Sequence, residues 1–238
     1  MKKKLTAVAL VVCMLAIMLV GASLAYFTDT QAKTNTFTMG KVGITLTEPE
    51  WDKLEKNKDG DMKVYPGQSY DKDPTITVDA DSEKCWLIAT VTINNKANLE
   101  RLFEGTNVAT QWGLSLAGNG GLVSGGVASY DPAPATKNNT SGTTLSKDGK
   151  EVAFITYEEK DDTIIYTYYF LEAHSAGAKE ILFEKVNIPA TIDNNFFNEN
   201  ADNASTDLLN ITVNAYAIQE KGFDDVFAAY TAYKTQES

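Results

Sequence analysis

The feature that most constrains this chain is an uncharged apolar run near its start, from Ala7 to Val20. A basic segment at residues 1–4 precedes the run, and the small residues Ser23 and Ala25 follow it. This order, with small residues at the two positions that a signal peptidase reads, is typical of a secretory signal. The run is shorter than the roughly 20 residues that span a bilayer. We therefore expect cleavage before Tyr26 and a secreted protein, with an uncleaved N-terminal anchor as the alternative.

The charge balance argues against several partners. The chain has 21 Lys and Arg against 32 Asp and Glu, a net charge of −11. Three of the lysines lie in the expected leader, so cleavage would leave 18 basic side chains and a net charge of −14. Nucleic acids and anionic membranes need basic patches, so we expect neither as a partner. The same repulsion keeps separate subunits dispersed until salt or cations screen it.

Cysteine usage excludes an internal disulfide in the cleaved protein. Cys13 lies inside the apolar run and would leave with the leader, so Cys85 would remain alone. Cys13 is not expected to carry a lipid, because Val12 stands where a lipid-attachment motif has a small residue.

Five stretches of sequence resemble a known family. The run from Ala25 to Asp29 (AYFTD) is followed by Asn35 to Gly40 (NTFTMG) and by a strand that ends in LTEPEWD, at Leu46 to Asp52. These stretches, with YPGQSYDKDPTITV at Tyr65 to Val78, resemble the TasA and camelysin family of secreted matrix proteins of Gram-positive bacteria. The resemblance returns at Ile211 to Phe223 (ITVNAYAIQEKGF).

The resemblance implies both a maturation route and a function. It implies processing by a signal peptidase of the SipW type, a jelly-roll-like fold and assembly into biofilm matrix fibres. Camelysin is also described as a metalloprotease, so the resemblance leaves a secreted metallo-endopeptidase open.

The pattern of the chain predicts an all-β domain over residues 26–238, as a two-sheet, jelly-roll-like β-sandwich with one or two short peripheral helices. Alternating apolar residues predict strands that are bounded by turn residues. The expected strands are Val42–Leu46, Thr75–Val78, Cys85–Asn95, Glu151–Tyr157, Thr163–Leu171, Ile181–Val186 and Leu209–Ala217. We expect a helical turn at Asn98–Phe103, capped by Asn95 or Asn98, and a helix at Gly222–Tyr233, capped by Asp224. The composition of Gly105–Lys150 indicates a loop-rich insertion.

The strand expected at Thr163–Leu171 has two possible roles. Its sequence, TIIYTYYFL, is uncharged and strongly β-prone, which favours pairing between molecules if the strand lies at an edge. We favour the alternative, a core strand whose charged neighbours in Glu158–Asp162 prevent such pairing.

No catalytic site is expected. A zinc peptidase of the HExxH type needs two histidines one helical turn apart, and this chain has one histidine, His174. No GxSxG motif offers a nucleophile. We therefore expect no enzyme activity and no cofactor.

Calcium is the one ion for which the sequence offers candidate ligands. Glu55–Asp61 has oxygen ligands at alternate positions, but Pro66 stands where a calcium loop has a bidentate glutamate. Asp71, Asp73, Asp79 and Asp81 form a second acidic group. For both groups we favour solvated loops over a dedicated site.

The segment that follows the expected cut is the candidate for assembly. Residues 26–38 form a polar stretch in which Phe27 and Phe37, with Met39 just beyond, offer apolar anchors around Asp29. We expect this segment to add as a strand to the sheet of a second copy, which would propagate into a homopolymeric fibre. An accessory anchor protein is a further possible partner. The alternatives are that the segment folds back on its own domain, or that the 105–150 loops make the protein a surface adhesin.

Overall fold

The protein is described by a computed structural model that covers residues 41–56, 62–102, 122–130, 142–190 and 210–237. Chain contacts divide it into two units, Met1–Met39 and Gly40–Ser238, and the described residues all belong to the second. The secondary structure of that unit is mostly β, as the alternating pattern predicted. Its strands form two facing layers around one main core.

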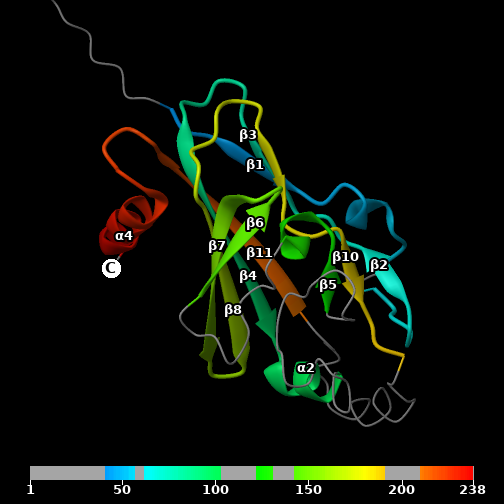
Figure 1. Ribbon diagram of the computed structural model, residues 1–238. Coiled ribbons are helices and arrows are strands. Elements are labelled where there is room, and N and C mark those ends of the chain that lie inside the picture. The colour runs from blue at the N-terminus through cyan, green and yellow to red at the C-terminus, as the bar shows by residue number, and fades with distance from the viewer. Residues whose placement is uncertain (1–40, 57–61, 103–121, 131–141, 191–209, 238) are drawn as a thin grey trace, which may run out of the picture. The chain divides into compact units, whose positions relative to one another are not determined.

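One layer is a five-stranded antiparallel sheet in the order β11-β4-β8-β7-β6 (Figure 1). The strands are β4 (Cys85–Asn94), β6 (Thr143–Lys147), β7 (Lys150–Lys160), β8 (Thr163–Phe170) and β11 (Asn210–Gln219). β8 lies between β4 and β7, so the uncharged window is a core strand, as we favoured from the sequence.

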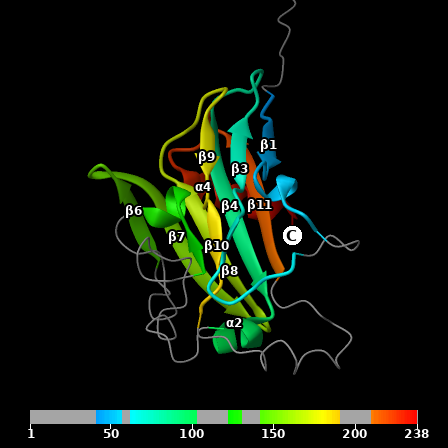
Figure 2. The same ribbon diagram turned by 90° about the vertical axis from the view of Figure 1, so that its right-hand side faces the viewer.

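The other layer consists of two three-stranded sheets, β1-β3-β9 and β2-β10-β5. Their strands are β1 (Ile44–Thr47), β2 (Ser69–Asp71), β3 (Thr75–Val78), β5 (Val123–Ser124), β9 (Lys179–Ile181) and β10 (Lys185–Asn187). Figure 2 shows β1, β3 and β9 side by side in front of the five-stranded sheet.

These two small sheets are halves of a single ladder. Thr75 lies opposite Ile181 and Asp71 lies opposite Lys185, so the register is unchanged from one half to the other. Between the halves, Lys72 N–H donates to Glu184 O and Leu182 N–H donates to Pro74 O, each at 3.0 Å. Pro74 has no N–H to donate back to the carbonyl of Leu182, which explains why the ladder is divided into two sheets at this point.

The ladder continues around a corner into the five-stranded sheet. The N–H of Val78 donates to the carbonyl of Ala178, and Cys85 and His174 then exchange two backbone hydrogen bonds. Beyond that bridge, β4 pairs with β8. An antiparallel ribbon that winds from one sheet to the other in this way gives the sandwich its jelly-roll-like character.

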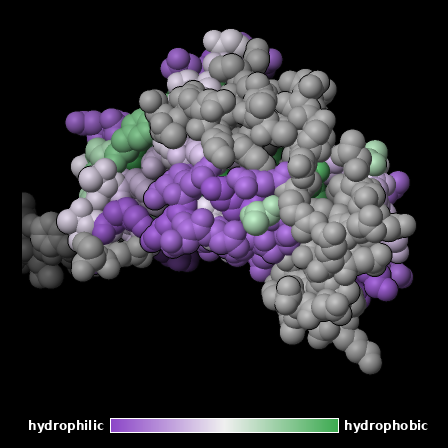
Figure 3. Space-filling model, turned by 90° about the horizontal axis from the view of Figure 1, so that it is seen from below, coloured by the Kyte–Doolittle hydropathy of each residue, from purple (hydrophilic) through white to green (hydrophobic). Residues whose placement is uncertain are grey.

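The core lies between the layers and is apolar and tightly closed at its centre. Along β4 and β8 the inward-facing side chains are 0–2% exposed. Seen from below, the described part of the surface is mainly hydrophilic (Figure 3), as expected for a charged domain whose apolar side chains are sequestered. The largest fully buried side chains include Tyr166, Tyr168, Phe170 and Phe183.

Among the described residues, four short helical segments accompany the strands. They are η1 (Trp51–Lys53), α2 (Lys96–Leu102), η2 (Gly126–Ser129) and α4 (Val226–Glu237). Asn95 accepts a hydrogen bond from the N–H of Asn98 at 3.3 Å, so it is the cap that precedes α2. The cap predicted for the C-terminal helix was wrong by one residue, because Asp225 rather than Asp224 accepts from the N–H of Ala228, at 2.8 Å.

α4 explains why β4 is apolar on both faces. It packs on the outer face of the five-stranded sheet, where Val226 and Ala229 join Trp86 and Ile88 in a second buried cluster. The outer face of β4 is therefore covered at this end by a helix. The strand predicted at Ile181–Val186 is instead divided between β9 and β10, and β5, η2 and β6 lie in the described parts of the loop-rich insertion.

Candidate functional site: an open seam between β1 and β11

The two layers are not fully closed along the margin where β1 and β11 meet. The inward-facing side chains of β11 pack against the core but stay partly exposed; they are Ile211, Val213, Ala215 and Ala217. On β1, Ile44 is also partly buried, and Leu46 is 37% exposed. β1 and β11 contact each other (Figure 2), so these residues line one apolar seam.

The backbone of β11 is unpaired along this seam. The N–H of Glu220 donates to the carbonyl of Lys84 at 2.9 Å, and the register pairs Ile218 with Trp86. Because antiparallel hydrogen bonds alternate, the even-numbered residues of β11 bond to β4 and the odd-numbered ones face away. The outward N–H and C=O groups therefore belong to Ile211, Val213, Ala215, Ala217 and Gln219. Within the described residues, no strand pairs with this edge.

The same alternation exposes the outer edge of β1. The N–H of Asp79 donates to the carbonyl of Gly43 at 3.0 Å, which turns the backbone groups of Gly43 and Thr45 toward β3. The groups of Ile44 and Leu46 then face the seam. Two unpaired strand edges therefore flank one partly exposed apolar surface.

β11 lacks the protections that edge strands commonly carry. Its ten residues, NITVNAYAIQ, include no charged side chain and no proline. The opposite edge of the same sheet differs, because β6 has five residues, a register shift between Leu145 and Ser146, and Lys147 at its end. Short length, bulges and lysines all discourage pairing with another chain. The β11 edge is thus the more open of the two.

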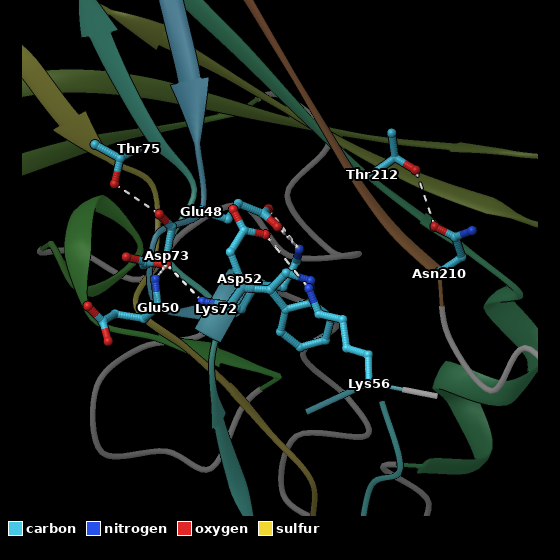
Figure 4. A network of polar contacts seen from close by, with 10 residues as sticks. Glu48, Glu50, Asp52, Lys56, Lys72, Asp73, Thr75, Asn210 and Thr212 are labelled. Carbon is cyan, nitrogen blue, oxygen red and sulfur yellow. Dashed lines mark hydrogen bonds and ion pairs between the residues drawn. The ribbon is translucent and has the colours of Figure 1, made fainter. Parts of the chain in front are cut away.

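A polar lock holds the chain where it leaves β1 (Figure 4). The ammonium group of Lys72 lies 2.7 Å from both carboxylate oxygens of Glu48, and Lys72 is 7% exposed. The next residue, Asp73, is 9% exposed and accepts hydrogen bonds from the N–H groups of Glu50, at 2.8 Å, and Trp51, at 3.4 Å. We call Glu48, Trp51, Lys72 and Asp73 the polar lock.

Trp51 completes the polar lock through its ring. The ammonium group of Lys72 lies 4.7 Å from the ring centroid and that of Lys56 lies 4.9 Å from it. Cation–π contacts of this kind are stronger when a charge is shielded from water, as that of Lys72 is. The lock therefore fixes the direction of the chain between β1 and β2.

The other end of β1 is held by exposed polar contacts. Lys41 pairs with Asp81 at 2.5 Å, and the hydroxyl of Thr45 donates to Asp79 at 2.9 Å. The ammonium group of Lys41 lowers the pKa of the Asp81 carboxyl. β1 is thus held at both ends by polar contacts and only weakly by burial.

The single histidine has protein partners. Its Nε2 lies 2.9 Å from a carboxylate oxygen of Glu180, and its ring packs edge-on against Phe170 with centroids 5.6 Å apart. The ring is 13% exposed, and its Nδ1 has no hydrogen-bond partner. In the part of the chain that the structure describes, no three His, Cys, Asp or Glu side chains are grouped as metal ligands would be.

The acidic groups considered for calcium are partly accounted for. Asp71 pairs with Lys185 at 2.6 Å, and Asp73, Asp79 and Asp81 have the partners given above. The other candidate, Glu55–Asp61, lies largely outside the described residues, since 57–61 are not among them.

The residues predicted for cleavage and assembly also lie outside the described part of the chain. They are Ser23, Ala25, Tyr26, Phe27, Asp29, Phe37 and Met39. What sequence reasoning missed is the surface that could accept such a segment. The absence of charge across Asn210–Gln219 was the available signal, and it resembled an ordinary core strand.

The fold and the seam define a class: an all-β sandwich with one unprotected strand edge and a polar lock beside it. Residues 1–70 match the family model of the camelysin metallo-endopeptidase. This match covers 70 of the 238 residues and supports the resemblance of the N-terminal part of the chain to the TasA and camelysin family. No curated protein and no solved structure matches the chain. No helix among residues 41–237 that are described has the length and apolar character needed to cross a bilayer.

Proposed function

We propose that this protein is a secreted structural subunit of extracellular matrix fibres, assembled when residues 26–38 of one copy add as a strand to the sheet of the next. The observation that carries the proposal is the open seam between β1 and β11. Unpaired N–H and C=O groups at a sheet edge bind an extended segment through main-chain hydrogen bonds. Partly exposed apolar side chains beneath that edge would bury alternate side chains of the incoming strand.

Length and charge support this pairing. Thirteen residues of extended chain are enough to run beside all ten residues of β11, at about 3.3 Å per residue. The segment contains one acid, Asp29, and one base, Lys33, and cleavage before Tyr26 adds a positively charged α-amino group. It therefore meets little repulsion from an acidic subunit. Phe27 and Phe37 are ten residues apart and share one face of an extended strand, because side chains on the same face recur every second residue.

Cleavage would set the direction of assembly. While the leader is attached, the segment is tethered to it; once a signal peptidase of the SipW type cuts before Tyr26, the segment is released. A contact between the front of one copy and the seam of another is heterologous, so it propagates into a filament. An accessory protein could anchor the end of such a filament.

A second candidate is a secreted metallo-endopeptidase, which the description of the matching family favours. In this chain His174 and Glu180 are the one His–carboxylate contact of the described residues. Casein hydrolysis with and without a chelator separates the two functions. Chelator-sensitive hydrolysis by purified protein would favour the peptidase.

The fibre proposal is tested by two changes, one on each side of the contact. Deletion of residues 26–37 removes the incoming strand. Ala215→Pro removes one outward N–H from β11 and no bond to β4, so the domain should still fold. We expect both variants to stay monomeric when the wild-type protein forms filaments in negative-stain micrographs.

A matched control uses the opposite edge. The N–H of Thr144 on β6 also faces away from its partner strand, because Leu145 and Thr143 lie in the hydrogen-bonded positions. Thr144→Pro should therefore leave filaments unchanged. Normal filaments from the deletion variant would overturn strand addition, and normal filaments from Ala215→Pro alone would exclude β11 as the acceptor.

A further inference from the structure

Four tyrosines gather where α4 covers the outer face of the five-stranded sheet. Tyr169 belongs to β8, Tyr216 to β11, and Tyr230 and Tyr233 to α4. We call these residues the tyrosine cluster; they are four of the eleven tyrosines in the chain. Each is partly exposed, so oxidants in the solvent can reach them.

The rings form a connected series. The centroids of Tyr216 and Tyr233 are 5.5 Å apart, and those of Tyr169 and Tyr230 are 5.6 Å apart. Tyr230 lies 6.1 Å from Tyr216 and stacks on Tyr233 at 6.2 Å. All four rings carry a phenol, which is the group that a one-electron oxidant acts on.

We infer that the tyrosine cluster is an oxidative cross-linking site, at which Tyr216 and Tyr233 couple to form a dityrosine that fastens α4 to β11. Of the pairs in the cluster, this one has the shortest distance between rings. It joins two elements that are separate in the sequence, so the bond would close a covalent loop. Partly exposed side chains move on the picosecond to nanosecond scale, which allows two neighbouring rings to reorient toward each other.

The reaction needs a one-electron oxidant, which a haem peroxidase supplied with hydrogen peroxide provides. Each phenol loses one electron and one proton, and the two phenoxyl radicals combine through a carbon–carbon bond between ring positions ortho to the oxygens. The hydrogens displaced from those two carbons return to the oxygens, which restores both phenols. Hydrogen peroxide accepts the two hydrogen atoms removed and becomes two molecules of water.

Tyr169 is the less suitable partner. Burial raises the pKa of its phenol, so its neutral form is favoured and it yields phenolate less readily than an exposed tyrosine does. It also packs against Phe154 and Phe227, whose rings cannot couple in this way.

A dityrosine would add a covalent link between α4 and the sheet, which no disulfide among the described residues provides. Cys85 is a free, buried cysteine, and α4 is held on the sheet by side-chain packing. A cross-link between residues 216 and 233 would restrict the unfolded chain and so raise the unfolding temperature, as a disulfide across a short loop does.

The experiment treats purified protein that begins at Tyr26 with a haem peroxidase and hydrogen peroxide. We expect dityrosine fluorescence in the monomer, a loss of two hydrogens in its intact mass, a linked peptide containing Tyr216 and Tyr233, and a higher unfolding temperature. Tyr216→Phe and Tyr233→Phe keep the ring packing and should each lose most of this signal.

Tyr65→Phe is the matched control, because Tyr65 is 60% exposed and lies outside the cluster. It should cross-link like the wild-type protein. An unchanged signal in Tyr233→Phe, a signal found only in covalent dimers, or no dityrosine at all would each overturn the inference. Circular dichroism before oxidation verifies that the variants are folded.

Discussion

Lys72 places its ammonium group 2.7 Å from both carboxylate oxygens of Glu48, and the contact joins two stretches of sequence that resemble one family. Glu48 belongs to LTEPEWD and Lys72 to YPGQSYDKDPTITV. Lys72 is the fixed centre of the polar lock, because it binds a carboxylate and an indole ring together. The two stretches therefore act as one structural unit that sets the path of the chain from β1 to β2.

Lys72→Met should destabilise the domain by about 3 kcal/mol, because it leaves Glu48 partly buried without its counter-charge. The free energy of unfolding, measured by urea titration, tests this. Lys185→Met is the control: its pair with Asp71 is about half exposed, so a loss of about 0.5 kcal/mol is expected. Equal losses in the two variants would contradict the role given to the polar lock.

Asp73→Ala should cost about 1–2 kcal/mol, since two backbone N–H groups lose their acceptor at the start of η1. The loss should couple with that of Lys72→Met, because both residues hold the same turn. A double-mutant cycle on unfolding free energies measures this coupling. Strict additivity would show that the two contacts act independently.

Tyr166→Phe should stabilise the domain by about 1 kcal/mol, because the buried hydroxyl of Tyr166 has no hydrogen-bond partner and its burial is uncompensated. Tyr157→Phe should have the opposite sign, since the Tyr157 hydroxyl donates to Glu159. Thermal unfolding of the two variants gives the comparison. Destabilisation of both would indicate that the hydroxyl of Tyr166 has a partner in solution.

Alkaline pH should destabilise the domain through two fully buried tyrosines, Tyr166 and Tyr168. Burial raises the pKa of Tyr166 and Tyr168 above the ordinary range, so folding favours the neutral phenol. Their contribution to stability is complete below the unfolded-state pKa of about 10 and is lost as pH rises from there toward the folded-state pKa. Unfolding free energy measured between pH 9 and 11 should fall less steeply in Tyr168→Phe than in the wild-type protein.

Cys85 should be unreactive in the folded protein. It is 0% exposed, and burial raises the pKa of its thiol, so thiolate is scarce. In cleaved protein it is the sole cysteine, so alkylation followed by mass spectrometry reports on it alone. We expect slow modification in buffer and rapid modification in guanidinium chloride. Fast modification under native conditions would mean that the corner near His174 opens readily.

The sequence pattern predicted most of the strands but not the open seam between β1 and β11. Alternation along Thr75–Val78 and Thr163–Leu171 is a local signal, because a buried face imposes a period of two on any strand. The openness of β11 is not local. Val213 and Val91 occupy equivalent positions on paired strands, yet Val91 is completely buried and Val213 is partly exposed, because β8 flanks β4 and no described strand flanks β11.

The polar lock is a second feature that local sequence patterns did not predict. Glu48 and Lys72 were each visible in stretches that resemble the family, but their pairing depends on the ladder that places Lys72 opposite Glu184. The cap of α4 was misplaced by one residue because Asp224 and Asp225 are adjacent and both are suitable. Which of two adjacent Asp residues caps a helix depends on the local backbone geometry, which the identity of the residues does not determine.

The ribbon formed by β2, β3 and β4 with β8, β9 and β10 has a consequence for how the protein folds. It joins residues near 70 to residues near 186, so its two halves are separated by much of the chain. Closing so large a loop costs conformational entropy before the stabilising contacts between the two halves can form, and this slows folding. During synthesis the first half cannot pair until Asn187 has emerged, so the nascent polypeptide cannot complete this ribbon until most of the chain has been made.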